Sequence, residues 1–151
     1  MRESLRFYID GKWVAPLELQ TLDVENPATG ETSGKVALGS AADVDRAVKA
    51  ARRAFASWSE SRREERIRLL ESILREYQKR SGDLAAALTE EIGAPTALAQ
   101  GFQVQLGAGH VSKAIEVLQS FAFEEKRGTT LVVKEPIGVC GLITPWNWPM
   151  N

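Results

Sequence analysis

The hydrophobic positions of this chain follow two spacings, which divide it into extended and helical regions. Residues 7–14 alternate between apolar and polar around Asp10-Gly11, a pair that favours a two-residue hairpin turn. A second turn is expected near Gly30, which can take the positive φ that closes it, before a short extended stretch at residues 35–38. The N-terminal region is therefore predicted to consist of short strands.

From Ser40 onward the apolar spacing becomes helical. Ser40 and Asp43 form a capping-box pattern, and Ser61 and Glu64 form a second one. A third helical segment is expected to end at Gly93, a residue suited to a helix C-terminus. The positions predicted to form the apolar faces of the first two helices are Val44, Val48, Ala51, Phe55, Ile67, Leu70, Ile73, Leu74 and Tyr77.

Helical spacing continues over residues 98–118, although glycines interrupt it. Gly101, Gly107 and Gly109 each cost a helix up to about 1 kcal/mol relative to alanine. The pattern therefore predicts a helix that either bends in this region or packs very closely against a neighbour.

The C-terminal region returns to extended patterns. Residues 129–134 are rich in β-branched side chains and predict a strand, and the continuous apolar run at residues 137–143 predicts a buried one. A buried parallel strand needs neighbours, and each parallel neighbour needs a crossover of a dozen or more residues. We therefore expect residues 137–143 to be the first strand of a sheet whose other strands are not in this sequence.

Composition and charge narrow the possible functions. The net charge is −1, from 19 Lys and Arg against 20 Asp and Glu, which predicts neither nucleic acid nor an anionic membrane as a partner. Residues 1–7 have no apolar core typical of a leader, and no apolar run approaches the ~20 residues of a membrane span. We expect a cytoplasmic protein, and the single cysteine, Cys140, is consistent with a reducing compartment.

The turn at residues 144–150 is the strongest candidate for a functional site. Pro145 and Pro149 prevent regular hydrogen bonding and enclose Asn147 between two tryptophans. The Asn147 amide is a neutral group with two N–H donors. It can either cap the turn or donate to a ligand that carries negative charge, and the pattern leaves both possibilities open.

Several segments in this order resemble the N-terminal part of the NAD(P)-dependent aldehyde dehydrogenases. They are residues 26–31 (Asn-Pro-Ala-Thr-Gly-Glu), 43–48, 50–55, 91–95, 134–139 and the final 143–149 (Ile-Thr-Pro-Trp-Asn-Trp-Pro). The resemblance covers essentially the whole chain and implies an α/β fold. It implies that residues 1–128 form the N-terminal part of the NAD(P)-binding domain, and that residues 129–137 form a strand of an oligomerisation arm. Residues 138–151 would hold the first Rossmann-type strand and the oxyanion turn.

The resemblance also assigns roles to individual residues. Asn147 would donate to the oxyanion formed when a cysteine thiolate attacks an aldehyde. The NAD or NADP path would be lined by Ile143, Thr144, Pro145 and Trp146, and the small-molecule aldehyde would contact Trp148, Phe102 and Leu106. For these lining residues, plain core packing is the alternative. The family's catalytic cysteine and glutamate lie further along its chain, so we expect this chain alone to be inactive and the full-length protein to be a homo-oligomer, a dimer or tetramer.

Other interpretations remain. The chain could be a non-catalytic assembly or binding module derived from the family, or part of a relative that transfers the acyl group to coenzyme A. Cys140 lies in an apolar run without a cationic or histidine partner, so we do not expect it to be a nucleophile. His110 is the only histidine and no metal site is predicted, although Glu91 and the Val24 carbonyl lie near a region where some relatives hold a monovalent cation.

Overall fold

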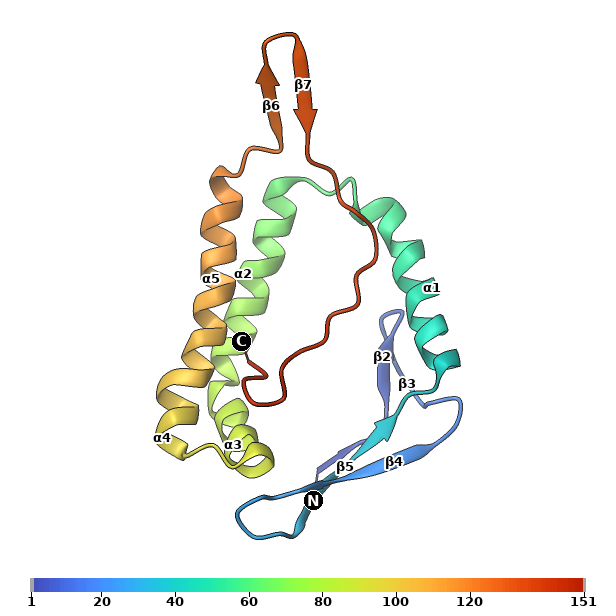
Figure 1. Cartoon of the computed structure of the whole chain (residues 1–151), viewed down its shortest axis with the longest axis vertical. Helices are drawn as coiled ribbons and strands as arrows, with labels where there is room; N and C mark the ends of the chain where they lie inside the picture. The colour runs from blue at the N-terminus through green and yellow to red at the C-terminus, as the bar shows by residue number, and fades with distance from the viewer. Residues whose placement is uncertain (1, 151) are drawn as a thin grey trace.

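Two small sheets form the N-terminal region of the computed structural model, which describes residues 2–150 (Figure 1). Strands β2 (Phe7–Ile9) and β3 (Lys12–Val14) pair antiparallel. The residues between them, Asp10 and Gly11, have φ of 56° and 73°, as a tight turn between twisted strands requires. The predicted hairpin is confirmed.

The second sheet has the order β1-β5-β4, built from β1 (Arg2–Ser4), β4 (Gln20–Glu25) and β5 (Thr32–Leu38). β1 runs parallel to β5, and β4 runs antiparallel to it. The predicted turn connects β4 to β5, and Gly30 has a φ of 73° there. The extended stretch expected at residues 35–38 is the second half of β5.

Helix α1 (Ala41–Trp58) begins as the sequence predicts. The Ser40 hydroxyl accepts from the Asp43 N–H, and the Asp43 carboxylate accepts from the Ser40 N–H at 3.0 Å. Asp43 is buried and also accepts from the Leu17 N–H at 3.0 Å, which ties the chain after β3 to the start of the helix. The donors at Leu17 and Ser40 lower the pKa of the Asp43 carboxyl.

Replacing Asp43 with asparagine is expected to lower the melting temperature at neutral pH, because the amide has one acceptor oxygen where the carboxylate has two. The folded-state pKa of Asp43 is lowered, so its stabilisation is present above about pH 4 and is lost as the pH falls below that value. Thermal melts of the wild type and the variant from pH 7 to pH 3 should therefore converge. Asp45→Asn, at an exposed position of the same helix, is the control, and a difference for Asp43→Asn that stays constant with pH would contradict this linkage.

Helices α2 (Arg63–Lys79) and α3 (Ser81–Ile92) follow, with a change of direction near Arg80. The predicted cap of α2 is wrong by one residue: the Glu65 carboxylate, not Glu64, accepts from the backbone N–H of Arg62 at 2.7 Å. Adjacent glutamates make the two registers hard to separate by sequence. Gly93 ends α3 with a φ of 70°, as predicted.

The region around the three glycines contains a π-helical turn and one position of very close packing. After the short helix α4 (Thr96–Leu98), residues Ala99–Gln103 form a π-helical turn that contains Gly101, and helix α5 (Val104–Ser120) continues from it. Gly107 lies in α5 and is buried, whereas Gly109 faces open space. Close packing, one of the two predicted alternatives, is found at Gly107, and Gly101 lies in a π-helical turn instead of a regular helix.

The buried core lies where α3, the π-helical turn and α5 meet. It consists of Ala85, Leu88, Ala94, Ala99 and Val104, with Tyr77, Leu84, Ile92 and Met150 packed around it. Several residues predicted to face a core are instead exposed, among them Val44, Val48, Ala51 and Ile73. Within residues 2–150 no element covers these faces, so their apolar spacing forms helices without burying them.

Strands β6 (Glu124–Arg127) and β7 (Thr130–Val133) form a hairpin that projects beyond the helices (Figure 1). The strand predicted at residues 129–134 is confirmed as β7. Its partner β6 carries only charged side chains and has no alternation that would predict a strand.

The segment after β7 departs from the prediction. Residues 137–143 pair with no strand in the described part of the chain, and Ile137 and Ile143 are 94% and 99% exposed. A strand requires a hydrogen-bonded neighbour, and none of residues 2–150 supplies one. The segment instead runs without regular structure from β7 back along the molecule, and the chain ends beside α2 and α3 (Figure 1).

No helix within residues 2–150 is both long and apolar enough to cross a membrane. The cytoplasmic location stays a prediction.

Candidate functional site

The Pro-Trp-Asn-Trp-Pro turn is held against the helices at its C-terminal end. Met150 packs on the core formed by α3 and α5, and its carbonyl oxygen lies beside Gly107. The two prolines restrict the backbone on either side of the bend at residues 146–148. The turn therefore has a defined position although the segment before it is unpaired.

Two of the three predicted substrate residues, Phe102 and Trp148, are in contact where this turn meets the helices. The rings of Phe102 and Trp148 are 5.5 Å apart between centroids and nearly perpendicular, at 83°. This edge-to-face geometry is favourable for aromatic pairs. Phe102 comes from the π-helical turn and remains half-exposed, so the pair presents an aromatic surface next to Asn147.

Leu106, the third predicted substrate residue, lies one helical turn after Phe102 on α5 and is half-buried. Its position is compatible with the same apolar surface, and its contact with an aldehyde stays a prediction.

Asn147 is exposed, and its side chain forms no hydrogen bond with any residue from 2 to 150. A capping role would require the amide to bond to its own turn. The described contacts that fix the turn are instead the packing of Met150 and the Phe102–Trp148 pair. The Asn147 N–H groups are thus available to an incoming ligand.

The four predicted cofactor residues, Ile143, Thr144, Pro145 and Trp146, are all exposed, with Ile143 at 99% and Trp146 at 83%. Core packing therefore does not account for them within the described residues. They carry no charge and follow one another directly before Asn147. They lie side by side because they are consecutive in the sequence, and the segment that holds them pairs with no strand among the described residues.

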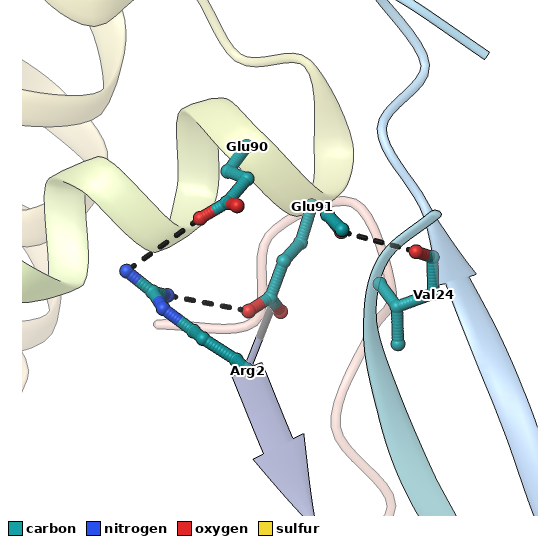
Figure 2. Close-up of polar contacts among 5 residues, drawn as sticks. Arg2, Val24, Glu90 and Glu91 are labelled. Carbon is teal, nitrogen blue, oxygen red and sulfur yellow. Dashed lines mark hydrogen bonds and ion pairs between the residues drawn. The ribbon is translucent and has the colours of Figure 1, made fainter. Parts of the chain in front are cut away.

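Glu90 and Glu91, at the end of α3, form ion pairs with the side chain of Arg2 on strand β1. The Arg2 guanidinium lies between Glu90 and Glu91, at 3.6 Å and 3.4 Å from their carboxylate oxygens (Figure 2). The Val24 carbonyl accepts from the Ser33 hydroxyl at 3.0 Å. This arrangement links strand β1 to α3.

Among residues 2–150 no group of three or more His, Cys, Asp or Glu side chains is arranged to hold a metal ion. Cys140 and His110 are both exposed, on the irregular segment and on α5 respectively.

Sequence reasoning missed how Tyr77 and Gly107 support the turn. The Tyr77 hydroxyl donates to the Val104 carbonyl at 2.8 Å, and burial raises the pKa of this phenol. The spacing of Tyr77 predicts an apolar-face residue but gives no information on its hydroxyl. For Gly107, the sequence predicted close packing but gave no indication that Tyr77 and Met150 are the neighbours.

Known proteins are similar to this chain along its length. The pattern of the aldehyde dehydrogenase family matches residues 13–151. A 3-succinoylsemialdehyde-pyridine dehydrogenase of a Pseudomonas species is 49% identical over 152 residues, which cover all of this chain and 32% of that protein.

Solved structures show the same fold. A crystal structure of an aldehyde dehydrogenase from Bartonella henselae matches with a TM-score of 0.96 and 39% identity, over all of this chain and 33% of that one. A mutant of aldehyde dehydrogenase C from Pseudomonas syringae, in complex with NAD+ and octanal, matches with a TM-score of 0.95 and 48% identity, over 97% of this chain and 30% of that one. The chain thus spans about a third of the length of these relatives, and matches them as an N-terminal part of an α/β fold. With its sequence and its fold both matched along their whole length, this chain belongs to the aldehyde dehydrogenase family.

Proposed function

We propose that this chain is the N-terminal part of an enzyme that oxidises an aldehyde to a carboxylic acid with NAD(P)+ through a cysteine thioester. The observation that carries the proposal is the exposed Asn147 amide, which has no partner among residues 2–150 and lies in an anchored turn beside an aromatic pair. A neutral N–H donor in a fixed position is what a developing oxyanion requires.

The residues of this chain would divide the work as follows. Asn147 stabilises the negative charge on the former carbonyl oxygen, and Trp148 and Phe102 hold the apolar part of the aldehyde and exclude water. Ile143, Thr144, Pro145 and Trp146 fit NAD(P)+ because they are exposed and uncharged, which suits packing against the adenosine and nicotinamide ribose. When bound, NAD(P)+ accepts the hydride. The similarity to the Pseudomonas syringae protein, whose structure contains NAD+ and octanal, supports both ligand classes.

The aromatic surface favours an apolar aldehyde over a charged one. In an enzyme that carries this segment, Phe102→Ala is expected to raise the KM for an apolar aldehyde by about tenfold with a smaller change in kcat, since the lost contact binds substrate and transition state alike. Initial rates of NADH or NADPH formation with an apolar and a charged aldehyde measure this.

Gln105→Ala, at an exposed position nearby on α5, is the matched control. Absence of any aldehyde-dependent reduction of NAD+ or NADP+ by the wild type would refute the proposed activity. Equal KM values for the wild type and Phe102→Ala would refute only the role of the aromatic surface.

A second candidate function is a non-catalytic assembly module. The projecting β6–β7 hairpin favours it, because Leu131 and Val133 are exposed and both strands have free edges among the described residues. The same hairpin supports a homo-oligomer, a dimer or tetramer, for the enzyme. A natural protein with an intact mass of 16.6 kDa would favour the module, and a longer one would favour the enzyme. The transfer of an acyl group to coenzyme A remains the alternative to hydrolysis.

A further inference from the structure

Gly107 is a point at which helix α5 comes very close to the C-terminal end of the functional turn. A Cβ atom added at Gly107 would lie 2.6 Å from the carbonyl oxygen of Met150 and 2.5 Å from the hydroxyl oxygen of Tyr77. Real Cβ atoms essentially never approach other heavy atoms so closely. Any side chain at position 107 must therefore displace the turn, the tyrosine or both.

Neither neighbour can yield without cost. The Tyr77 hydroxyl is held by its hydrogen bond to the Val104 carbonyl, and Val104 is itself 1% exposed in the core. The Met150 oxygen belongs to the backbone, and the Met150 side chain packs on the same core. Tyr77 and Met150 thus together fill the space that a side chain at Gly107 would need.

The Met150 carbonyl is three residues from Asn147, and the intervening Pro149 restricts rotation of the backbone between them. The chain between Met150 and Asn147 therefore has fewer free backbone rotations with which to absorb a displacement of Met150. The Phe102–Trp148 pair fixes the other side of the turn to the π-helical turn.

We propose that Gly107 and Tyr77 are positioning residues that set the location of the Asn147 donor by seating the Met150 carbonyl against α5. The effect on catalysis rests on the proposed function. The contact of the Met150 carbonyl with Gly107 is a property of this chain and does not depend on that function. Neither residue touches substrate: both act through the backbone of the turn.

The seating is tested on the 151-residue chain by fluorine NMR after incorporation of 5-fluorotryptophan, with resonances assigned by Trp→Phe variants. Gly107→Ala is expected to shift the Trp148 signal, which senses the Phe102 ring at 5.5 Å, and to leave the Trp13 signal unchanged. Gly109→Ala is the matched control, because a Cβ at Gly109 meets no atom within 4 Å on the same helix. A Trp148 signal that does not respond to Gly107→Ala overturns the proposal, whether or not the enzyme is active.

The catalytic consequence is tested in the enzyme that carries this segment. Gly107→Ala is expected to lower kcat by on the order of 10²-fold, as small misplacements of catalytic groups do, with the KM for NAD(P)+ unchanged. Tyr77→Phe combined with Gly107→Ala removes the clash with the hydroxyl but keeps the clash with Met150.

The double variant separates positioning from stability. It is expected to recover part of the melting temperature lost by Gly107→Ala, because one of the two close contacts is removed, while kcat stays low. Recovery of kcat together with the melting temperature would show that Gly107 serves only packing, and would overturn the proposal. Gly109→Ala should keep the wild-type kcat, and its melting temperature should equal or exceed that of the wild type because alanine favours a helix and meets no atom there.

Discussion

Replacing Asn147 with alanine in an enzyme that carries this segment is expected to lower kcat by on the order of 10²–10³-fold, the loss typical of removing one oxyanion donor. The affinity for NAD(P)+ should change little, because Asn147 follows the predicted cofactor residues instead of lying among them. Steady-state kinetics and a direct titration with NAD+ measure the two quantities.

The structure makes this variant informative because little else should change. Asn147 is exposed, and its side chain bonds to nothing among residues 2–150, so its truncation leaves no described polar group unpaired. Thermal melts should coincide with those of the wild type. Asn147→Asp is the isosteric comparison: it keeps the size but places a negative charge where the oxyanion forms, so its kcat should fall at least as far. A wild-type kcat for Asn147→Ala would show that the residue serves only the turn.

The 151-residue chain alone is expected to produce no NADH from NAD+ and an aldehyde. Its single cysteine, Cys140, is exposed on the irregular segment, and within residues 2–150 no histidine or cationic side chain forms a hydrogen bond with it. A thiol needs such a partner to become a strong nucleophile at neutral pH. Cofactor binding should also be weak, because residues 143–146 are joined to no sheet.

Purified chain, NAD+ and an apolar aldehyde, followed by NADH absorbance, test this expectation. Cys140→Ala is the matched variant. NADH formed by the wild-type chain and lost in Cys140→Ala would identify Cys140 as a nucleophile after all, and NADH formed by both would point to another residue.

What the sequence predicts well in this protein is local. The Asp10-Gly11 turn, the Ser40 cap and the Gly93 terminus each depend on the conformational preference of a few adjacent residues, and each is found where predicted. The one-residue error at the start of α2 has the same local origin, since Glu64 and Glu65 both suit the cap.

Burial was predicted less well, because apolar spacing specifies a face but not what covers it. Val44 and Val48 on α1 show this, and so do residues 137–143, which lack a neighbouring strand among the described residues. Strand β6 escaped prediction for a different reason: its all-charged side chains lie in an exposed hairpin, where pairing with β7 and a tight turn at Gly128 decide the structure.

For the site, family resemblance selected Asn147, Trp148 and Phe102; the rings of Phe102 and Trp148 are in contact, and the roles of all three residues stay predictions. The residues beneath the turn could not be selected in the same way. The closeness of Gly107 to Met150 joins positions 43 apart in sequence, and no local pattern encodes such a contact.

The fixed position of Met150 has a consequence for the segment that precedes it. With β7 held in its hairpin at one end and Met150 packed on the core at the other, residues 134–149 form a closed loop. Part of the conformational entropy of residues 134–149 is therefore already lost through contacts within this chain. In the longer enzyme proposed above, a strand that paired with residues 137–143 would meet a segment already tethered at both ends.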